Sequence, residues 1–141
     1  MVDENMSESG KLFTKTHQWF DPATKKVGLS AYAAEQLGEI SFVDLEGLAD
    51  AELTQVEMSG DEPTSDPIDA TVESSKAVGD VYSPVSGSVK EINEALMDEP
   101  EKINEDPYGA GWLYVIEPSN LDAEKGNLLS ADDYKAFTAS L

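Results

Sequence analysis

Residues 68–82 read IDATVESSKAVGDVY, in which β-branched residues flank a short tip of small and polar residues. Val, Ile, Thr and Tyr favour strands, whereas small polar residues favour turns. We therefore predict one strand over Ile68–Glu73 and another over Val78–Tyr82, joined at the tip Ser74–Ala77. The sequence indicates a β-hairpin with a lysine, Lys76, exposed at its tip.

The sequence on either side of the hairpin predicts further short strands and a helix. The helix spans Ala31–Leu37, because Ser30 can cap its first turn and Gly38 can end it. The further strands are predicted over Val27–Leu29, Ile40–Leu45, Ser88–Ile92 and Trp112–Ile116.

The rest of the chain predicts turns and small helices. Ser83–Gly87 is a turn, Asn93–Met97 a helical turn, and Asp98–Gly111 a loop rich in Pro and Gly. Ser130–Asp133 has the layout of a capping box and opens a helix toward the C-terminus. The sum is a mainly β protein, a flattened β-barrel or sandwich with small peripheral helices.

Charge divides the chain into regions. We predict a flexible acidic N-terminus over residues 1–10 and a single domain over residues 11–141. From residue 27 to residue 75 there is no basic residue, and residues 46–69 form a predicted acidic loop. Within it, Asp61–Pro67 contains two prolines and cannot be a central strand. The acidity is typical of a solvated surface, as in a salt-adapted protein.

Composition excludes several classes of function. The 141 residues include 9 basic residues, all Lys, and 29 acidic residues, which gives a net charge of −20. A chain this acidic would repel nucleic acid and anionic membranes, so we predict neither as a partner. With no Cys and one His, thiolate catalysis, a serine-protease triad built on another His, and a multi-His metal site are excluded. We interpret His17 as a hydrogen-bonded structural residue, and Trp19 and Trp112 as core residues.

Lys76 permits two explanations from the residues alone. It is the first cation after Lys26, and its neighbours Ser74, Ser75 and Ala77 leave its amine accessible. It is either an ordinary surface lysine or an attachment point for a swinging cofactor arm.

The segment Glu73–Ala77 (ESSKA) resembles the lipoylation motif of the glycine cleavage system H proteins. Biotin carriers share the fold but flank their lysine with methionines, where this chain has Ser75 and Ala77. Further segments resemble the same family in the same order: residues 27–29, 35–38, 42–45, 80–87, 92–96, 104–109 and 111–113. The resemblance covers about residues 13–137 and implies the barrel-sandwich hybrid fold of lipoyl- and biotinyl-carrying domains.

The resemblance implies a carrier that is not itself an enzyme. Lipoic acid would be joined by an amide bond to Lys76, and the arm would shuttle an aminomethyl group and reducing equivalents. The implied partners are glycine decarboxylase (P protein), aminomethyltransferase (T protein) and dihydrolipoamide dehydrogenase (L protein), together with a lipoate ligase or lipoyl transferase. We expect a monomer in the cytoplasm, with a mature mitochondrial protein as the alternative.

Motif matching also implies roles for four residues around the arm. Glu73 would help the lipoylating enzyme to recognise the tip, and Thr16, Gln18 and Asp80 would cradle the loaded arm. A carboxylate suits the cationic aminomethyl nitrogen. Gln18 stands where the family usually has Glu and brings no charge, so Asp80 is the acid that remains.

Two other functions stay open at this point. One is an H-like lipoyl protein that serves another pathway, such as sulfur oxidation with a heterodisulfide-reductase-like complex. Gln18 and the long loop over residues 46–69 motivate this alternative. The other is an unmodified acidic interaction module in which Lys76 is merely exposed.

Overall fold

The computed structural model describes residues 10–141, and the expected flexible N-terminus, residues 1–10, lies outside this range except for Gly10. The predicted hairpin is present as β8 (Thr71–Ser74) and β9 (Val78–Gly79). β4 (Ile40–Asp44) pairs with β8, which gives an antiparallel three-stranded sheet in the order β4-β8-β9. Both hairpin strands are shorter than predicted. β8 begins late because the backbone turns at Ala70, whose N–H donates to the Ile68 carbonyl, and β9 ends at Gly79, the last residue that pairs with β8.

The larger sheet has six antiparallel strands in the order β1-β2-β3-β11-β10-β5. Its strands are β1 (Leu12–Phe13), β2 (Gln18–Phe20), β3 (Lys26–Leu29), β5 (Glu52–Leu53), β10 (Gly87–Ile92) and β11 (Tyr114–Pro118). Trp19 packs flat on Gly28 across the β2–β3 pair, where a Cβ would come within 2.7 Å of the indole. The glycine is therefore what allows the tryptophan to lie over β3.

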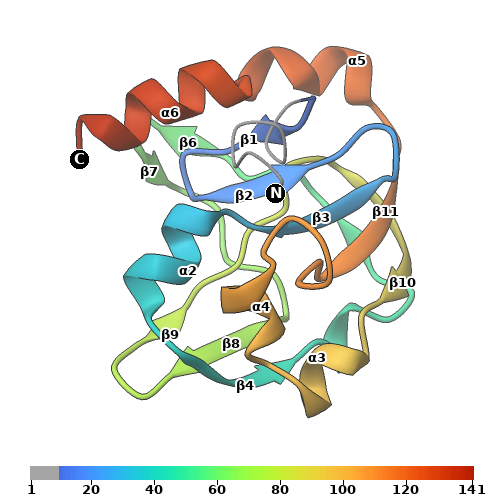
Figure 1. Ribbon diagram of the computed structural model, residues 1–141. Coiled ribbons are helices and arrows are strands. Elements are labelled where there is room, and N and C mark those ends of the chain that lie inside the picture. The colour runs from blue at the N-terminus through green and yellow to red at the C-terminus, as the bar shows by residue number, and fades with distance from the viewer. Residues whose placement is uncertain (1–9) are drawn as a thin grey trace.

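Two helices form where capping residues predict them. α2 (Ala31–Leu37) begins after Ser30, whose Oγ accepts from the Ala33 N–H, and ends at Gly38 with φ 81°. α6 (Ala131–Ala139) begins after Ser130, whose Oγ accepts from the Asp133 N–H. In Figure 1, α6 and the short helix α5 (Leu121–Glu124) lie along the top of the molecule and the β4-β8-β9 sheet lies at the bottom.

The prediction of a loop over residues 98–111 was wrong in part, and the strand after it begins later than predicted. The segment contains α4 (Lys102–Glu105), and α3 (Ala95–Asp98) precedes it. Burial of Ile103 anchors α4 to the core, which local Pro and Gly content does not reveal. Trp112, predicted to be a core residue, is only half-buried, with the Lys26 ammonium 5.1 Å from its ring centroid.

The acidic segment 46–69 is not purely a loop. It contains η1 (Glu46–Leu48), β5, and a small hairpin of β6 (Met58–Ser59) and β7 (Glu62–Pro63). Leu48 is fully buried, and β5 joins the edge of the larger sheet. The two remaining short helices, α5 (Leu121–Glu124) and η2 (Lys125–Asn127), precede α6.

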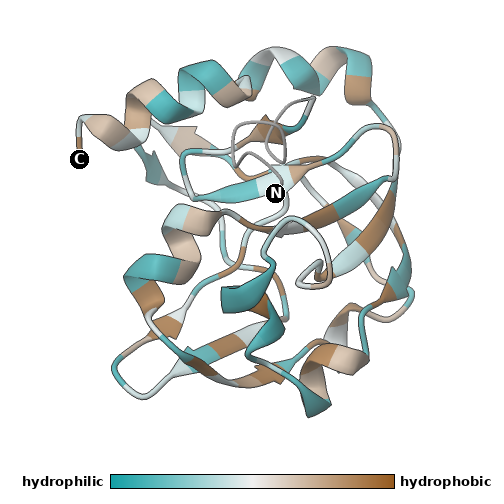
Figure 2. Ribbon diagram, in the orientation of Figure 1, coloured by the Kyte–Doolittle hydropathy of each residue, from teal (hydrophilic) through white to brown (hydrophobic). Residues whose placement is uncertain are grey.

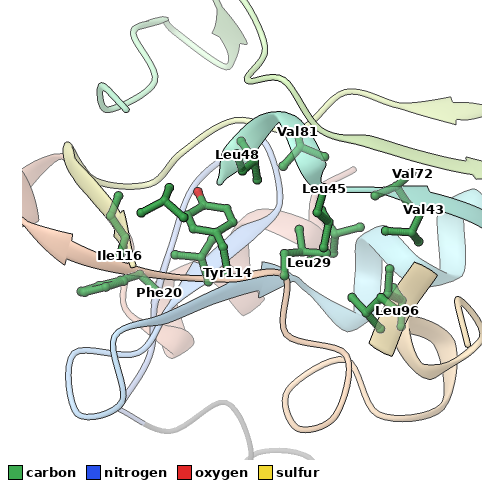
Figure 3. Packing of buried hydrophobic residues seen from close by; sticks show 14 of the residues in the cluster. Phe20, Leu29, Val43, Leu45, Leu48, Val72, Val81, Leu96, Tyr114 and Ile116 are labelled. Carbon is green, nitrogen blue, oxygen red and sulfur yellow. The ribbon is translucent and has the colours of Figure 1, made fainter. Parts of the chain in front are cut away.

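The sheets enclose the main hydrophobic core, which confirms the predicted mainly β architecture. Figure 3 shows Tyr114, Ile116 and Phe20 from the larger sheet facing Leu48, Leu45 and their neighbours on the opposite side. Hydrophobic and hydrophilic residues are mixed along β4 and β8 in Figure 2, and in β8 the side chain of Val72 is the one that is fully buried. In β3, by contrast, Val27, Gly28 and Leu29 are all buried. A smaller cluster of Phe13, Trp19 and Tyr134 joins α6 to β1 and β2. None of the helices in residues 10–141 has the length and apolar character needed to cross a membrane.

Candidate functional site

Lys76 is exposed at the tip of the β8–β9 hairpin, as predicted. The Ser74 N–H donates to the Ala77 carbonyl (2.8 Å) and closes the turn. The Ser74 hydroxyl accepts from the Ala77 N–H (3.2 Å) and donates to the Leu37 carbonyl at the end of α2 (2.6 Å). Hydrogen bonds therefore fix the conformation of the tip and also attach it to α2.

The hairpin packs closely on the C-terminal end of α2. The Lys76 side chain lies over Gly38, so that a Cβ on Gly38 would be 3.1 Å from Lys76 Cε. A Cβ on Gly79 would likewise come within 3.0 Å of the Leu37 side chain. Within residues 10–141, no carboxylate forms an ion pair with Lys76, so its amine is open to a reagent from solvent.

A cavity of about 180 Å³ lies beside the hairpin, between α2, β9 and the start of β2. Thr16, Gln18 and Asp80, the residues predicted to form the arm cradle, all line it. The structure thus brings these three residues to one place, while their role in binding an arm stays a prediction. The walls are mixed, with the apolar side chains of Leu29, Ala33, Leu37 and Val81 beside the polar groups of His17 and Gln36.

Gln18 is a fully engaged part of the cavity wall. Its side chain is 1% exposed, and its Oε1 accepts from the hydroxyls of Thr16 (2.5 Å) and Thr14 (3.3 Å). Its Nε2 donates to the Thr16 carbonyl (2.9 Å), which a glutamate at this position could not do when ionised. Asp80 is exposed and is the one carboxylate among the described residues that line the cavity.

His17 is held by the C-terminal helix, which confirms that it is a hydrogen-bonded structural residue. Its Nδ1 lies 2.7 Å from the Tyr134 hydroxyl, which also lies 2.6 Å from Ser30 Oγ at the cap of α2. Burial lowers the pKa of His17 below its ordinary value, so it is neutral at neutral pH. It therefore adds no charge to the cavity.

Sequence reasoning missed the apolar part of the cavity. Ala33 and Leu37 are one helical turn apart on α2, so their spacing indicated a shared apolar face without indicating what it covers. Glu73, predicted to aid recognition of the tip, is half-buried in β8, opposite Phe42 on β4 and Val78 on β9.

The rest of residues 10–141 was compared with the hairpin tip as a possible metal or ligand site. Residues 10–141 contain no group of His, Cys, Asp or Glu placed to hold a metal ion. A larger cavity of about 510 Å³ lies between the β6–β7 hairpin and the segment before α6, with Lys15, Met58 and Leu129 among its lining residues. It includes none of the predicted site residues, so the hairpin tip and the smaller cavity form the candidate site.

Comparison with known proteins agrees with the resemblance seen in the sequence. The family model for the glycine cleavage H-protein matches residues 11–140. A probable glycine cleavage system H protein of Pyrococcus abyssi is 42% identical over 143 aligned residues, covering 99% of this chain and 98% of the relative. One from Halobacterium salinarum is 44% identical over 127 residues, covering 90% of this chain and 92% of the relative.

A solved structure shows the same fold. The crystal structure of a glycine cleavage system H protein from Mycobacterium marinum superposes with a TM-score of 0.75 at 32% identity, covering 93% of this chain and 98% of that one. The protein therefore belongs to the family of glycine cleavage H-proteins, the carrier component of the glycine cleavage system.

Proposed function

We propose that this chain carries lipoate in amide linkage to Lys76 Nζ and is itself non-catalytic. The observation that carries the proposal is the exposed amine on a hairpin tip that Ser74 fixes to α2, an amine that forms no ion pair with any carboxylate of residues 10–141. A carrier lysine has to be reachable by several enzymes, and a rigid tip keeps it in one place for each of them. When attached, lipoate supplies a disulfide that accepts both electrons and a carbon unit.

The cavity beside the tip fits such an arm in chemistry. Its apolar wall suits the hydrocarbon part of the arm, and Asp80 suits a cationic amine at the loaded end. Gln18 forms part of the cavity wall, where its Oε1 accepts hydrogen bonds from the hydroxyls of Thr14 and Thr16, but it adds no charge. We propose that Asp80 alone supplies the charge that holds the aminomethyl nitrogen.

We further propose that the partners are glycine decarboxylase, aminomethyltransferase and dihydrolipoamide dehydrogenase, with a lipoate ligase or lipoyl transferase acting first. The names of the relatives support glycine cleavage over sulfur oxidation as the pathway served. The lipoylated protein would meet each enzyme in turn through the same tip.

A reconstituted decarboxylase reaction tests the proposed pathway. Lipoylated wild-type protein, incubated with glycine and glycine decarboxylase, should release carbon dioxide in proportion to its concentration and gain an aminomethyl mass on the Lys76 peptide. Lys76→Arg keeps the charge but cannot be lipoylated at that position, so it should support neither change. If the lipoylated wild-type protein gives no glycine-dependent mass gain, the glycine cleavage assignment fails for this chain.

A further inference from the structure

The outer face of the β4-β8-β9 sheet carries exposed apolar side chains next to the lysine tip. Among residues 10–141, the large hydrophobic side chains that are exposed are Phe42 (48%), Val78 (64%) and Leu141 (64%). Phe42 lies opposite Glu73, and Glu73 lies opposite Val78. Residues directly opposite in antiparallel strands point to the same face, so Phe42, Glu73 and Val78 form one continuous row across the sheet.

A β-bulge is what turns Phe42 outward. β4 pairs Ile40 with Ser74 and Phe42 with Glu73, so Ser41 is an extra residue in β4. Simple alternation would place Phe42 on the inner face with Ile40, but the bulge places it outside and Val43, which is 2% exposed, inside. Bulges commonly redirect a side chain beside a functional site. The fold thus forgoes the burial of an aromatic ring at this position.

The row lies directly below the tip. Glu73 precedes the turn that Ser74 and Ala77 close, and Val78 follows it, so both are adjacent to the base of the loop that carries Lys76. The apolar ends of the row are separated by one carboxylate, and no basic residue occurs between residues 27 and 75. A complementary partner would therefore present apolar surface on both sides of a cation.

We propose that Phe42 and Val78, the apolar ends of this row, form the docking surface of the enzyme that acylates Lys76 together with Glu73, to which the sequence resemblance already assigns a part in recognition of the tip. The inference rests on the proposed function. The acylating enzyme must bring its active centre to Nζ itself and so must cover the face beside the tip. Enzymes that use the finished arm react with its sulfur end, which is separated from Nζ by the length of the arm, so their chemistry does not require contact with the row.

The reaction that this docking serves is an acyl transfer from a lipoyl adenylate. The Lys76 ammonium loses a proton, and the free amine attacks the acyl carbon. The C–N bond forms, the bond from the acyl carbon to the phosphate oxygen breaks, and AMP leaves with the electron pair while the nitrogen releases a second proton. No redox change occurs in this step. The row would contribute to binding the enzyme, so its loss should raise KM for the unmodified protein.

Surface variants test the docking row against a matched control. A lipoate ligase with ATP and lipoate is given unmodified wild-type protein, the double variant Phe42→Ser/Val78→Ser, or the control Leu141→Ser, which alters the third exposed hydrophobic residue. Initial rates of the lipoyl mass gain are measured across protein concentrations, after circular dichroism has shown that each variant is folded. We expect kcat/KM for the double variant to fall roughly tenfold or more, mainly through KM, as when central apolar contacts are truncated. The Leu141→Ser protein should match the wild type.

Two charge-neutralising variants and an assay with glycine decarboxylase distinguish a docking defect from a loss of the carrier function. Glu73→Gln should also lower kcat/KM, whereas Asp132→Asn, which neutralises an exposed acid on α6 at the opposite end of the molecule, should have little effect. After full lipoylation by prolonged incubation, the Phe42→Ser/Val78→Ser variant should support glycine decarboxylase as well as the wild type does. A double variant that is acylated at the wild-type rate overturns the docking row while leaving the proposed function intact, as does a defect confined to the decarboxylase step. Failure of the wild type to be acylated at Lys76 overturns the proposed function itself.

Discussion

Asp80 and Gln18 differ in what they offer to a group bound in the cavity. Both line the same cavity, but the polar atoms of Gln18 are engaged by Thr14 and Thr16, whereas the carboxylate of Asp80 is exposed. A cationic group that enters the cavity therefore meets its opposite charge at Asp80 and at no other described lining residue. The loaded arm should depend on Asp80 alone for its charge-assisted hydrogen bond.

The substitution Asp80→Asn tests this dependence. It keeps the shape and one acceptor oxygen but removes the charge. The aminomethyl-loaded protein should therefore lose its carbon unit roughly tenfold to a hundredfold faster in the absence of other enzymes, since a hydrogen bond to a charged group contributes about 1.5–3 kcal/mol. The decay is followed by the mass of the Lys76 peptide. Asp44→Asn serves as the control, and equal decay of wild type and Asp80→Asn would show that Asp80 does not hold the amine.

His17 should make the stability of the fold depend on pH. Its pKa is lowered by burial from the ordinary value of 6.5, while its neighbours are the Tyr134 hydroxyl and the rings of Tyr32 and Phe137. As the pH falls below about 6.5, the unfolded chain binds a proton before the folded chain does, so the free energy of unfolding decreases. Above that pH, His17 is neutral in both states and contributes no pH dependence.

Urea unfolding at about pH 7.5, 6.5 and 5.5 measures this effect, with His17→Gln as the comparison. The carboxylates titrate in both proteins, so the difference between the two profiles isolates His17. The wild type should lose stability more steeply than His17→Gln as the pH falls. Parallel profiles would mean that the histidine is not held neutral in the folded state.

At the scale of single residues, motif matching predicted that Thr16, Gln18 and Asp80 surround one arm, and the structure brings these three residues to one cavity, while their roles stay predictions. The hydrogen bond between His17 and Tyr134 could not be predicted from the sequence, because the two residues are separated by more than a hundred positions. The bulge at Ser41 was equally hidden, since a strand with strict alternation would place Phe42 inside. These details depend on which elements meet, and local sequence does not carry that information.

The hairpin and α2 behave as one unit through Ser74. The last carbonyls of a helix lack intrahelical donors, and the Ser74 hydroxyl supplies one to the Leu37 carbonyl. The same oxygen accepts from the Ala77 N–H, so one side chain both closes the tip and fastens it to the helix. The position of Lys76 relative to the cavity depends on this attachment.

Ser74→Ala should loosen the tip without unfolding the core. The loss of these hydrogen bonds should lower the free energy of unfolding by about 1 kcal/mol and increase the amide exchange rates of residues 74–79 more than those of β10. Ser75→Ala is the matched control, since Ser75 is exposed at the neighbouring position. Unchanged exchange at the tip in Ser74→Ala would contradict the proposed attachment.

Elements with strong local signals were predicted well. The cap residues Ser30 and Ser130 set the starts of α2 and α6, and β-branched runs gave β4 and β10. α4 and β5 were missed because long-range contacts stabilise them, with Ile103 buried in the core and β5 paired to the edge of β10. For segments of this length, tertiary packing outweighs intrinsic propensity.

The whole molecule carries a charge of −20 with few cations to balance it. The ion pairs among residues 10–141 join exposed or partly exposed side chains, such as Lys25 with Glu117 and Lys15 with Asp61. Exposed pairs of this kind add little stability, so repulsion between the remaining carboxylates opposes folding.

Added salt should therefore stabilise the protein. Raising KCl from about 0.1 M to about 1 M shortens the Debye length from about 10 Å to about 3 Å and screens the carboxylates. We expect Tm to rise by roughly 4 °C, the shift that about 1 kcal/mol produces in a domain of this size. Differential scanning calorimetry measures the change. A Tm that is unaffected by KCl would show that the acidic surface does not destabilise the fold, and the salt-adaptation interpretation would lose its support.

The most direct test of the account is the mass of the intact protein after incubation with lipoate, ATP and a lipoate ligase. We predict a single lipoyl adduct, confined by peptide mapping to the peptide that contains Lys76 and absent in Lys76→Ala. The mass would then identify Lys76 as the attachment site on which the proposed cavity and docking row depend. An unmodified chain, under conditions that fully lipoylate a control H protein, would contradict the carrier function and leave an acidic binding module with the family fold.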